Sequence, residues 1–147
     1  MHWLTLLKSG ARYERVAIYD TNLHLRLEVA DSPAPPGGRS APIFFPSILG
    51  TNQYYMSDFH RHEDDTEIHL SLHCALRLAE SNAPFALLIM QINPHTYLYP
   101  LIQNWPIPGE TAETLLVRRE GDEVVFLNEL RHRTNTALNL RLPLADY

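Results

Sequence analysis

The chain has 147 residues, the usual size of a single domain, and its 17 acidic against 12 basic side chains give a net charge of -5 at pH 7. It contains no basic stripe with interleaved aromatic residues, so nucleic acid is not an expected partner. The single cysteine, Cys74, excludes an internal disulfide and a four-cysteine zinc site.

The first ten residues are expected to form the end of a helix. Lys8 and Gly10 are typical of a helix C-terminus, and four apolar residues before them have helical spacing: Trp3, Leu4, Leu6 and Leu7. The abrupt start suggests a helix cut from a longer protein, in which Met1 would be a cloning residue. The longest strongly apolar run, Phe85 to Ile92, is far shorter than the roughly 20 residues that span a bilayer.

Two strands are predicted next, at Arg12–Asp20 and Leu23–Val29, because apolar and polar residues alternate in both. The two polar residues between them, Thr21 and Asn22, suit a short hairpin turn. Residues 30–42 contain four prolines and two glycines, a composition that predicts a long flexible loop.

The rest of the chain is expected to contain six more strands and one helix. The helix is predicted over Pro94–Trp105, with Asn93 as its N-cap and a kink at Pro100. The predicted strands are Tyr54–His60, Glu67–Glu80, Pro84–Asn93, Ala112–Glu120, Glu123–His132 and Leu138–Leu144. Consecutive antiparallel strands with one crossover helix indicate the α+β class.

The segment from Ser57 to Cys74 holds four of the eight histidines and five carboxylates. If residues 62–66 turn the chain, His60 faces His69 and Asp58 faces Ser71 on one polar side, because side chains alternate along a strand. The other side would carry apolar residues for a core. This pattern predicts a half-buried hairpin whose tip is solvated.

The same segment also permits a metal site. His60 and His62 share a strand face, and Glu67 and His69 could complete a zinc or iron site. The pattern of these residues is similar to the first motif of the cupins, although Tyr54 and Cys74 replace that motif's glycines and no second histidine motif follows. A solvated polar face and a small-molecule pocket remain open beside the metal site.

No pattern indicates catalysis, because a nucleophile elbow and a glycine-rich phosphate loop are both missing. Polar residues do interrupt an apolar stretch near the C-terminus: Arg118, Asn128, Glu129 and Arg131. Such residues need an edge, a pocket or an ion pair, and the simplest expectation is a structural pair between Glu129 and an arginine.

Several pieces of the chain resemble a known family. They are the hairpin "SDFHRHEDDTEIHLSLHCAL", the helix piece "YPLIQ", and the strand pieces "AETLLVRREGDEV" and "FLNELRH". Together they are similar to the extracytoplasmic PAS-like sensor domains, also called PDC or Cache domains, of bacterial membrane-bound histidine kinases and diguanylate cyclases. The resemblance covers roughly Ala11 to Leu144.

The resemblance implies a single PAS-like domain over residues 1–147, with a central antiparallel sheet of about five strands, an N-terminal helix and one crossover helix. It also implies a place outside the inner membrane between two membrane helices, a homodimeric full-length protein, no catalysis by this part and no cofactor. A cupin-like metal enzyme is the alternative, and a sensor of pH or of a divalent ion is a third possibility.

In relatives the ligand lies between the sheet and the segment over one face, here Ser40 to Asp58 and the strands from Glu67 onward. The residues expected to bind a small molecule are Asp58, His60, Arg61, Arg118 and Glu129. Asp58 would meet an amine, and an arginine would meet a carboxylate or a phosphate. Ligand binding would shift the N-terminal helix.

Overall fold

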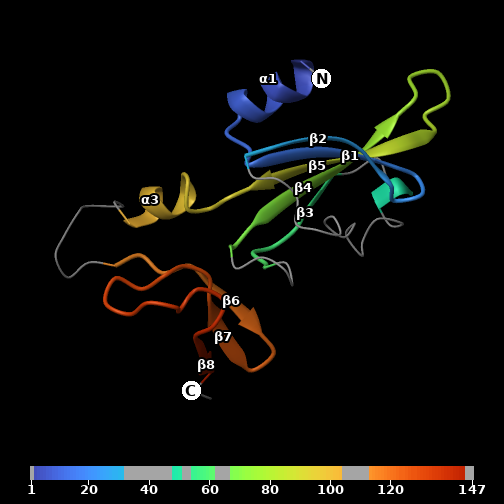
Figure 1. Ribbon diagram of the computed structural model, residues 1–147. Coiled ribbons are helices and arrows are strands. Elements are labelled where there is room, and N and C mark those ends of the chain that lie inside the picture. Colours follow the sequence, from blue (N-terminus) through green and yellow to red (C-terminus); the bar gives the residue numbers. More distant parts are fainter. Residues whose placement is uncertain (1, 32–47, 51–53, 62–66, 104–112, 145–147) are drawn as a thin grey trace. The chain divides into compact units, whose positions relative to one another are not determined.

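The computed structural model describes residues 2–31, 48–50, 54–61, 67–103 and 113–144 (Figure 1). The chain divides into two compact units, Met1–Asn93 and Pro94–Tyr147, and each is described by itself. The expectation of a single domain over the whole chain therefore stays a prediction. Most of the predicted loop at 30–42 lies outside the described residues.

The first unit contains an antiparallel sheet of five strands with the order β2-β1-β5-β4-β3 (Figure 1). The strands are β1 (Arg15–Asp20), β2 (Leu25–Ala30), β3 (Tyr54–Met56), β4 (Leu70–Arg77) and β5 (Pro84–Ile92). The α+β class and the five-stranded antiparallel sheet were predicted correctly. The sheet is open, with β2 and β3 at its edges, so the described strands do not close into the barrel that a cupin requires.

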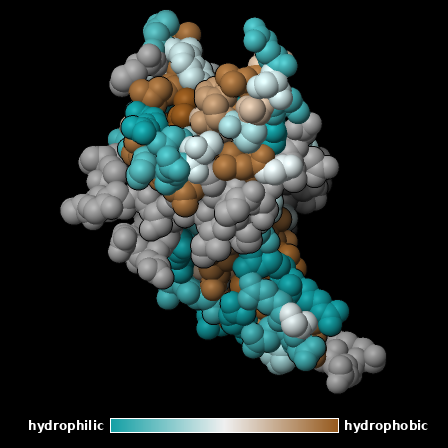
Figure 2. Space-filling view, turned by 90° about the vertical axis from the view of Figure 1, so that its right-hand side faces the viewer, coloured by the Kyte–Doolittle hydropathy of each residue, from teal (hydrophilic) through white to brown (hydrophobic). Residues whose placement is uncertain are grey.

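Helix α1 (His2–Gly10) packs on one face of this sheet. Leu4 is fully buried there, and Leu7 packs beside it, as the helical spacing predicted. The sheet contributes every second residue of its strands to this apolar face: Val16, Ile18, Leu72, Leu76, Ala86, Leu88 and Met90. Trp3 and Leu6 are on the outer side of the helix and are 50% and 59% exposed. Figure 2 shows hydrophobic and hydrophilic side chains side by side on one surface of the molecule.

The opposite face of the sheet has its own apolar cluster. Ala17, Tyr19, Leu87 and Ile89 alternate with the residues that face α1, and Ile48 packs against them. Arg77 fixes the segment around Ile48 to the sheet, because its Nη2 donates to the carbonyl of Leu49 at 2.6 Å. Alternate residues of each strand therefore belong to opposite faces, as the two-residue period of a β-strand requires.

The turn between β1 and β2 begins after Asp20, as predicted, but β2 starts two residues later than predicted, at Leu25. Asp20 organises this turn. Its Oδ1 accepts hydrogen bonds from the backbone amides of Asn22 at 2.8 Å and His24 at 3.0 Å. Its Oδ2 accepts a hydrogen bond from Nε of Arg26 at 2.8 Å. These bonds lower the pKa of Asp20 to about 2, the backbone bond from His24 being the largest cause. Leu23 lies in the left-handed region with φ 70°, which is unfavourable for leucine.

The histidine hairpin has the predicted bridge between His60 and His69. Between this bridge and β3, the strand pairing is shifted by one residue from the predicted register. Strands β3 and β4 place Tyr55 opposite His73, and Ser57 donates its amide to the carbonyl of Ser71 at 2.8 Å. Ser71 was predicted to face Asp58. The extra residue between the bridge and β3 explains the difference, because it moves Asp58 out of register.

The second unit contains helix α3 (Leu98–Gln103) and an antiparallel sheet with the order β6-β7-β8. Its strands are β6 (Val117–Glu120), β7 (Glu123–Phe126) and β8 (Arg141–Pro143). The predicted crossover within one sheet is wrong, because α3 belongs to a unit with its own sheet. The helix also begins at Leu98 and not at Pro94, so Pro100 lies in its first turn, where a missing amide hydrogen costs little.

The strands of the second unit are shorter than predicted, and side chains bind the backbone beyond β6 and β7. Asn128 accepts the amide of Leu116 at 2.7 Å and donates to the carbonyl of Thr114 at 3.2 Å. Tyr99 of α3 is buried and donates a hydrogen bond from its hydroxyl to the carbonyl of Leu127, which fixes the helix to the end of β7.

In the described part of the chain, no helix combines the length and the apolar character that crossing a membrane needs.

Candidate functional site

Buried polar side chains gather on the face of the five-stranded sheet that is opposite to α1. In the described part of the first unit, five polar or charged residues are buried: Arg15, His69, Ser71, His73 and Gln91. All five alternate with the residues that face α1, and three of them lie side by side across β1, β5 and β4, because Arg15 pairs with Gln91 and Gln91 with Ser71. We call this surface the polar face.

Arg15, on β1, is held in the polar face by two partners. Its Nε forms an ion pair with Glu28 on β2, and its Nη2 donates to the hydroxyl of Tyr19 at 2.8 Å. The guanidinium also lies 5.8 Å from the centre of the Tyr19 ring. A charge that is 4% exposed would be costly alone, and these contacts neutralise it.

His69 is fully buried and lies next to a carboxylate. Its Nδ1 is 3.1 Å from Oε2 of Glu14, the residue before β1. The ring of His60 lies 6.4 Å away across the bridge, centre to centre. His60 is partly exposed, and its Nδ1 is 2.9 Å from the carbonyl oxygen of Asp58.

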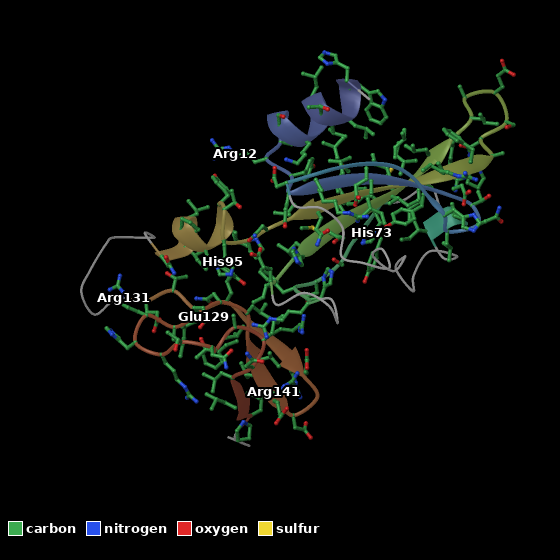
Figure 3. All side chains as sticks on the ribbon, in the orientation of Figure 1. Arg12, His73, His95, Glu129, Arg131 and Arg141 are labelled. Carbon is green, nitrogen blue, oxygen red and sulfur yellow. The ribbon has the colours of Figure 1, made fainter. Side chains whose placement is uncertain are left out.

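His73 is the member of the polar face whose side chain has a buried nitrogen without a hydrogen bond in the described structure. Its ring is 4% exposed and lies on the side of the sheet away from α1 (Figure 3). Tyr55 is its neighbour across the strand pair, with ring centres 5.8 Å apart. No residue of the described structure makes a hydrogen bond to its buried Nδ1. Burial, and then the nearby His60, lower the pKa of His73 to about 4, so the ring is neutral at pH 7.

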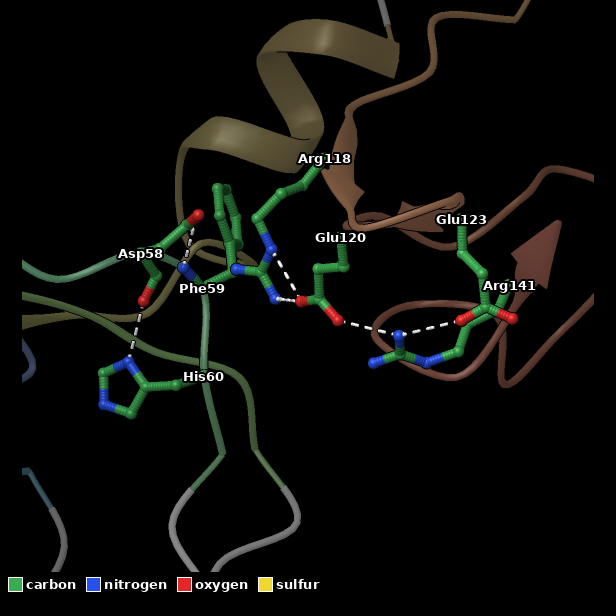
Figure 4. A network of polar contacts seen from close by, with 7 residues as sticks. All are labelled: Asp58, Phe59, His60, Arg118, Glu120, Glu123 and Arg141. Atoms are coloured by element: carbon green, nitrogen blue, oxygen red, sulfur yellow. Dashed lines mark hydrogen bonds and ion pairs between the residues drawn. The ribbon is translucent and has the colours of Figure 1, made fainter. Parts of the chain in front are cut away.

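The three predicted ligand residues of the hairpin lie close together in sequence but differ in exposure. Asp58 was expected to lie deep along the strand, and it is exposed, with its carboxylate accepting the amide of Phe59 at 2.7 Å (Figure 4). His60 and Arg61 are partly buried. His60 approaches the polar face through His69, since their ring centres are 6.4 Å apart.

Arg118 and Glu129 belong to the second unit, and each has a structural role there. Arg118 forms an ion pair with Glu120, which also binds Arg141 at 2.7 Å (Figure 4). Those two arginines lower the pKa of Glu120, Arg141 having the larger effect. Glu129 accepts the amide and the hydroxyl of Thr136 at 2.9 and 3.1 Å. The expected pair between Glu129 and an arginine is wrong, since this carboxylate organises the loop before β8.

The residues of the alternative metal site do not converge where the structure describes them. Glu67 accepts a hydrogen bond from Asn93 at 2.7 Å, and His69 faces Glu14. His62 lies outside the described residues. Among the described histidine, cysteine and carboxylate side chains, no group of three is placed to hold a metal ion.

The sequence reasoning missed Arg15, His73 and Gln91 as members of the site. A signal was available, because these residues occupy alternate positions within strands that are otherwise apolar. In β5, for example, Gln91 follows Leu87 and Ile89 at the same period of two. A polar residue in such a series must be buried with partners or with a ligand.

The comparisons with known proteins give no further assignment. No protein-family model, no curated protein and no solved structure matches this chain.

Proposed function

We propose that this chain is the ligand-sensing part of a bacterial membrane-bound signalling protein, a histidine kinase or a diguanylate cyclase. In this proposal it is a PAS-like domain on the outer side of the inner membrane. It binds a small molecule on the polar face and catalyses no reaction. The resemblance of the hairpin and of the C-terminal pieces to that family is the sequence argument.

One structural observation carries the proposal. One face of the five-stranded sheet carries buried polar side chains beside its apolar cluster, and the other face carries the apolar contact with α1. A sheet that only served as a core would be expected to be apolar on both faces when both are buried. The polar residues on a buried face are therefore the best candidates for ligand contacts.

The same arrangement supports a way to transmit the signal. Strands β1 and β5 carry Arg15 and Gln91 toward the polar face and Val16 and Met90 toward α1. A ligand that binds one packing of the sheet more tightly than another shifts the population toward it. Since Leu4 of α1 is buried against these strands, a change in the packing of the sheet also changes how α1 packs on it.

The exposed side of α1 supports a dimer in the full-length protein. Trp3 and Leu6 are half or more exposed, and a second copy of the helix would bury them. In this proposal the two helices pair, and the ligand alters how they pair.

The proposal is tested by a melting-temperature screen of the chain against amino acids, organic acids, amides, sugars and divalent metal ions. A ligand that binds the folded state raises the melting temperature in a dose-dependent way. The screen is repeated with Ser71→Val, which alters the polar face, and with Leu72→Val, which alters the adjacent residue on the α1 side.

We expect at least one compound to stabilise the wild type and Leu72→Val but to stabilise Ser71→Val less. If no compound stabilises the wild type, the sensing function is wrong. If a compound stabilises all three proteins equally, the ligand binds elsewhere.

A further inference from the structure

The polar face leaves one deeply buried nitrogen without a partner. Nδ1 of His73 has no hydrogen bond in the described structure although its residue is 4% exposed. A buried polar atom in this state costs free energy unless a water or a ligand satisfies it. A hydrogen bond from a bound group to Nδ1 of His73 would therefore remove this free-energy cost and favour binding at this position of the polar face.

Two buried basic residues of the polar face already have acidic partners. Arg15 pairs with Glu28, and the buried His69 lies beside Glu14, each within the sheet or at its edge. His73 itself is neutral at pH 7, because burial lowers its pKa to about 4. Neither Arg15 nor His69 therefore offers an unpaired group to a charged ligand, and a buried ion would be desolvated without a partner from either of them.

The neighbours of His73 favour a flat group. The ring of Tyr55 lies 5.8 Å from that of His73 and is inclined to it by 52°. Ile89 is the cross-strand neighbour on the other side, and Ala75 is the next residue on the same face of β4. An aromatic ring, an apolar branched side chain and a small residue form a surface suited to a planar apolar body.

We propose that the ligand of the polar face is an uncharged molecule with a flat apolar body and a neutral hydrogen-bonding group, such as an amide or hydroxyl, that binds Nδ1 of His73. This inference rests on the proposed function and specifies its ligand. It differs from the expectation that Arg61 or Arg118 binds a carboxylate or a phosphate, because the contact proposed here is with the neutral ring of His73.

The experiment compares three probes of similar shape and different charge, namely benzamide, benzoate and benzylammonium. The 147-residue chain, labelled with ¹⁵N in its histidines, is titrated with each probe at pH 7.5. The chemical shift of Nδ1 of His73 reports a new hydrogen bond directly. We expect benzamide to give a saturable shift, with a dissociation constant lower than that of either ion by about tenfold or more.

Three variants locate the contact. His73→Phe keeps a ring but removes the nitrogens and should abolish benzamide binding, whereas His73→Asn returns a polar atom near Nδ1 and should restore part of it. His95→Phe, in the second unit, is the matched control and should bind as the wild type does. If His73→Phe does not fold, the three-probe comparison in the wild type still decides.

The outcomes separate this inference from the function on which it rests. If benzoate or benzylammonium shifts Nδ1 as strongly as benzamide does, the neutral ligand class is wrong while a sensing function stands. If no probe shifts Nδ1, a water satisfies His73 and the inference is wrong. The sensing function is then judged by the melting-temperature screen alone.

Discussion

His73 should make the stability of the protein depend on pH. Its pKa is lowered to about 4 in the folded state, whereas an unfolded chain has a histidine pKa of about 6.5. The unfolded chain therefore binds the extra proton first, and the free energy of unfolding falls as the pH falls from about 6.5 toward 4. Between pH 7.5 and 5 the loss should be at most about 2 kcal/mol, measured by urea denaturation.

The control for this prediction is a second histidine. His73→Phe should remove the loss between pH 7.5 and 5, and the exposed His132→Gln should keep it. A pH profile of His73→Phe equal to that of the wild type would contradict the neutral, buried state of His73. Asp20 and Glu120 have lowered pKa values, so their contributions to stability are lost only at lower pH. They do not interfere between pH 7.5 and 5.

Single residues were the hardest part to predict from the sequence. Glu129 and Arg118 were correctly recognised as unusual in an apolar stretch, but their partners, Thr136 and Glu120, depend on loop geometry that spacing does not encode. Asp58 was placed one residue wrong, because a bulge in a strand has no sequence signal here.

At the scale of elements, the turn between β1 and β2 carries backbone strain that a substitution should relieve. Leu23 has φ 70° and is 42% exposed, so little packing is lost on removing its side chain. Leu23→Gly should raise the free energy of unfolding by about 1 kcal/mol. Leu25→Gly, two residues later inside β2, should instead lower it by about 1 kcal/mol. Urea denaturation at pH 7.5 measures both, and equal effects would contradict the turn geometry.

A buried hydrogen bond helps to attach α3 within the second unit. Tyr99 is 3% exposed, and its hydroxyl donates to the carbonyl of Leu127. Tyr99→Phe leaves that carbonyl without this donor and should cost about 1 to 1.5 kcal/mol of stability. Tyr97→Phe, where the side chain is 57% exposed, should change stability by less than about 0.5 kcal/mol, as judged by the same denaturation experiment. A similar loss in both variants would show that the Tyr99 bond contributes nothing specific.

Most elements were predictable because their periodicity is strong. The hairpin of β1 and β2, the long strands β4 and β5, and the helix that buries Leu4 all follow from apolar spacing. Helix α3 was predicted too long, since Pro94 suits the start of a helix and nothing local showed that the helical turns begin at Leu98.

At the scale of the whole molecule, strand order and the division into units were beyond local patterns. Strand β5 lies between β1 and β4, which joins residues more than 70 positions apart, such as Val16 and Met90. Such long-range pairing depends on which faces can be buried together and not on any single segment. The break after Asn93 was not predicted either, because no change of composition marks it.

A ligand on the polar face should change the packing of α1 on the other face of the same sheet. Trp3, half exposed on α1, reports this directly once the second tryptophan is removed by Trp105→Phe. The measurement is the fluorescence emission of Trp3 during titration with a compound that stabilises the protein. We expect a saturable change with the dissociation constant of the thermal response, and its loss in Ser71→Val. Saturated binding with unchanged Trp3 emission would show that the ligand does not act on α1.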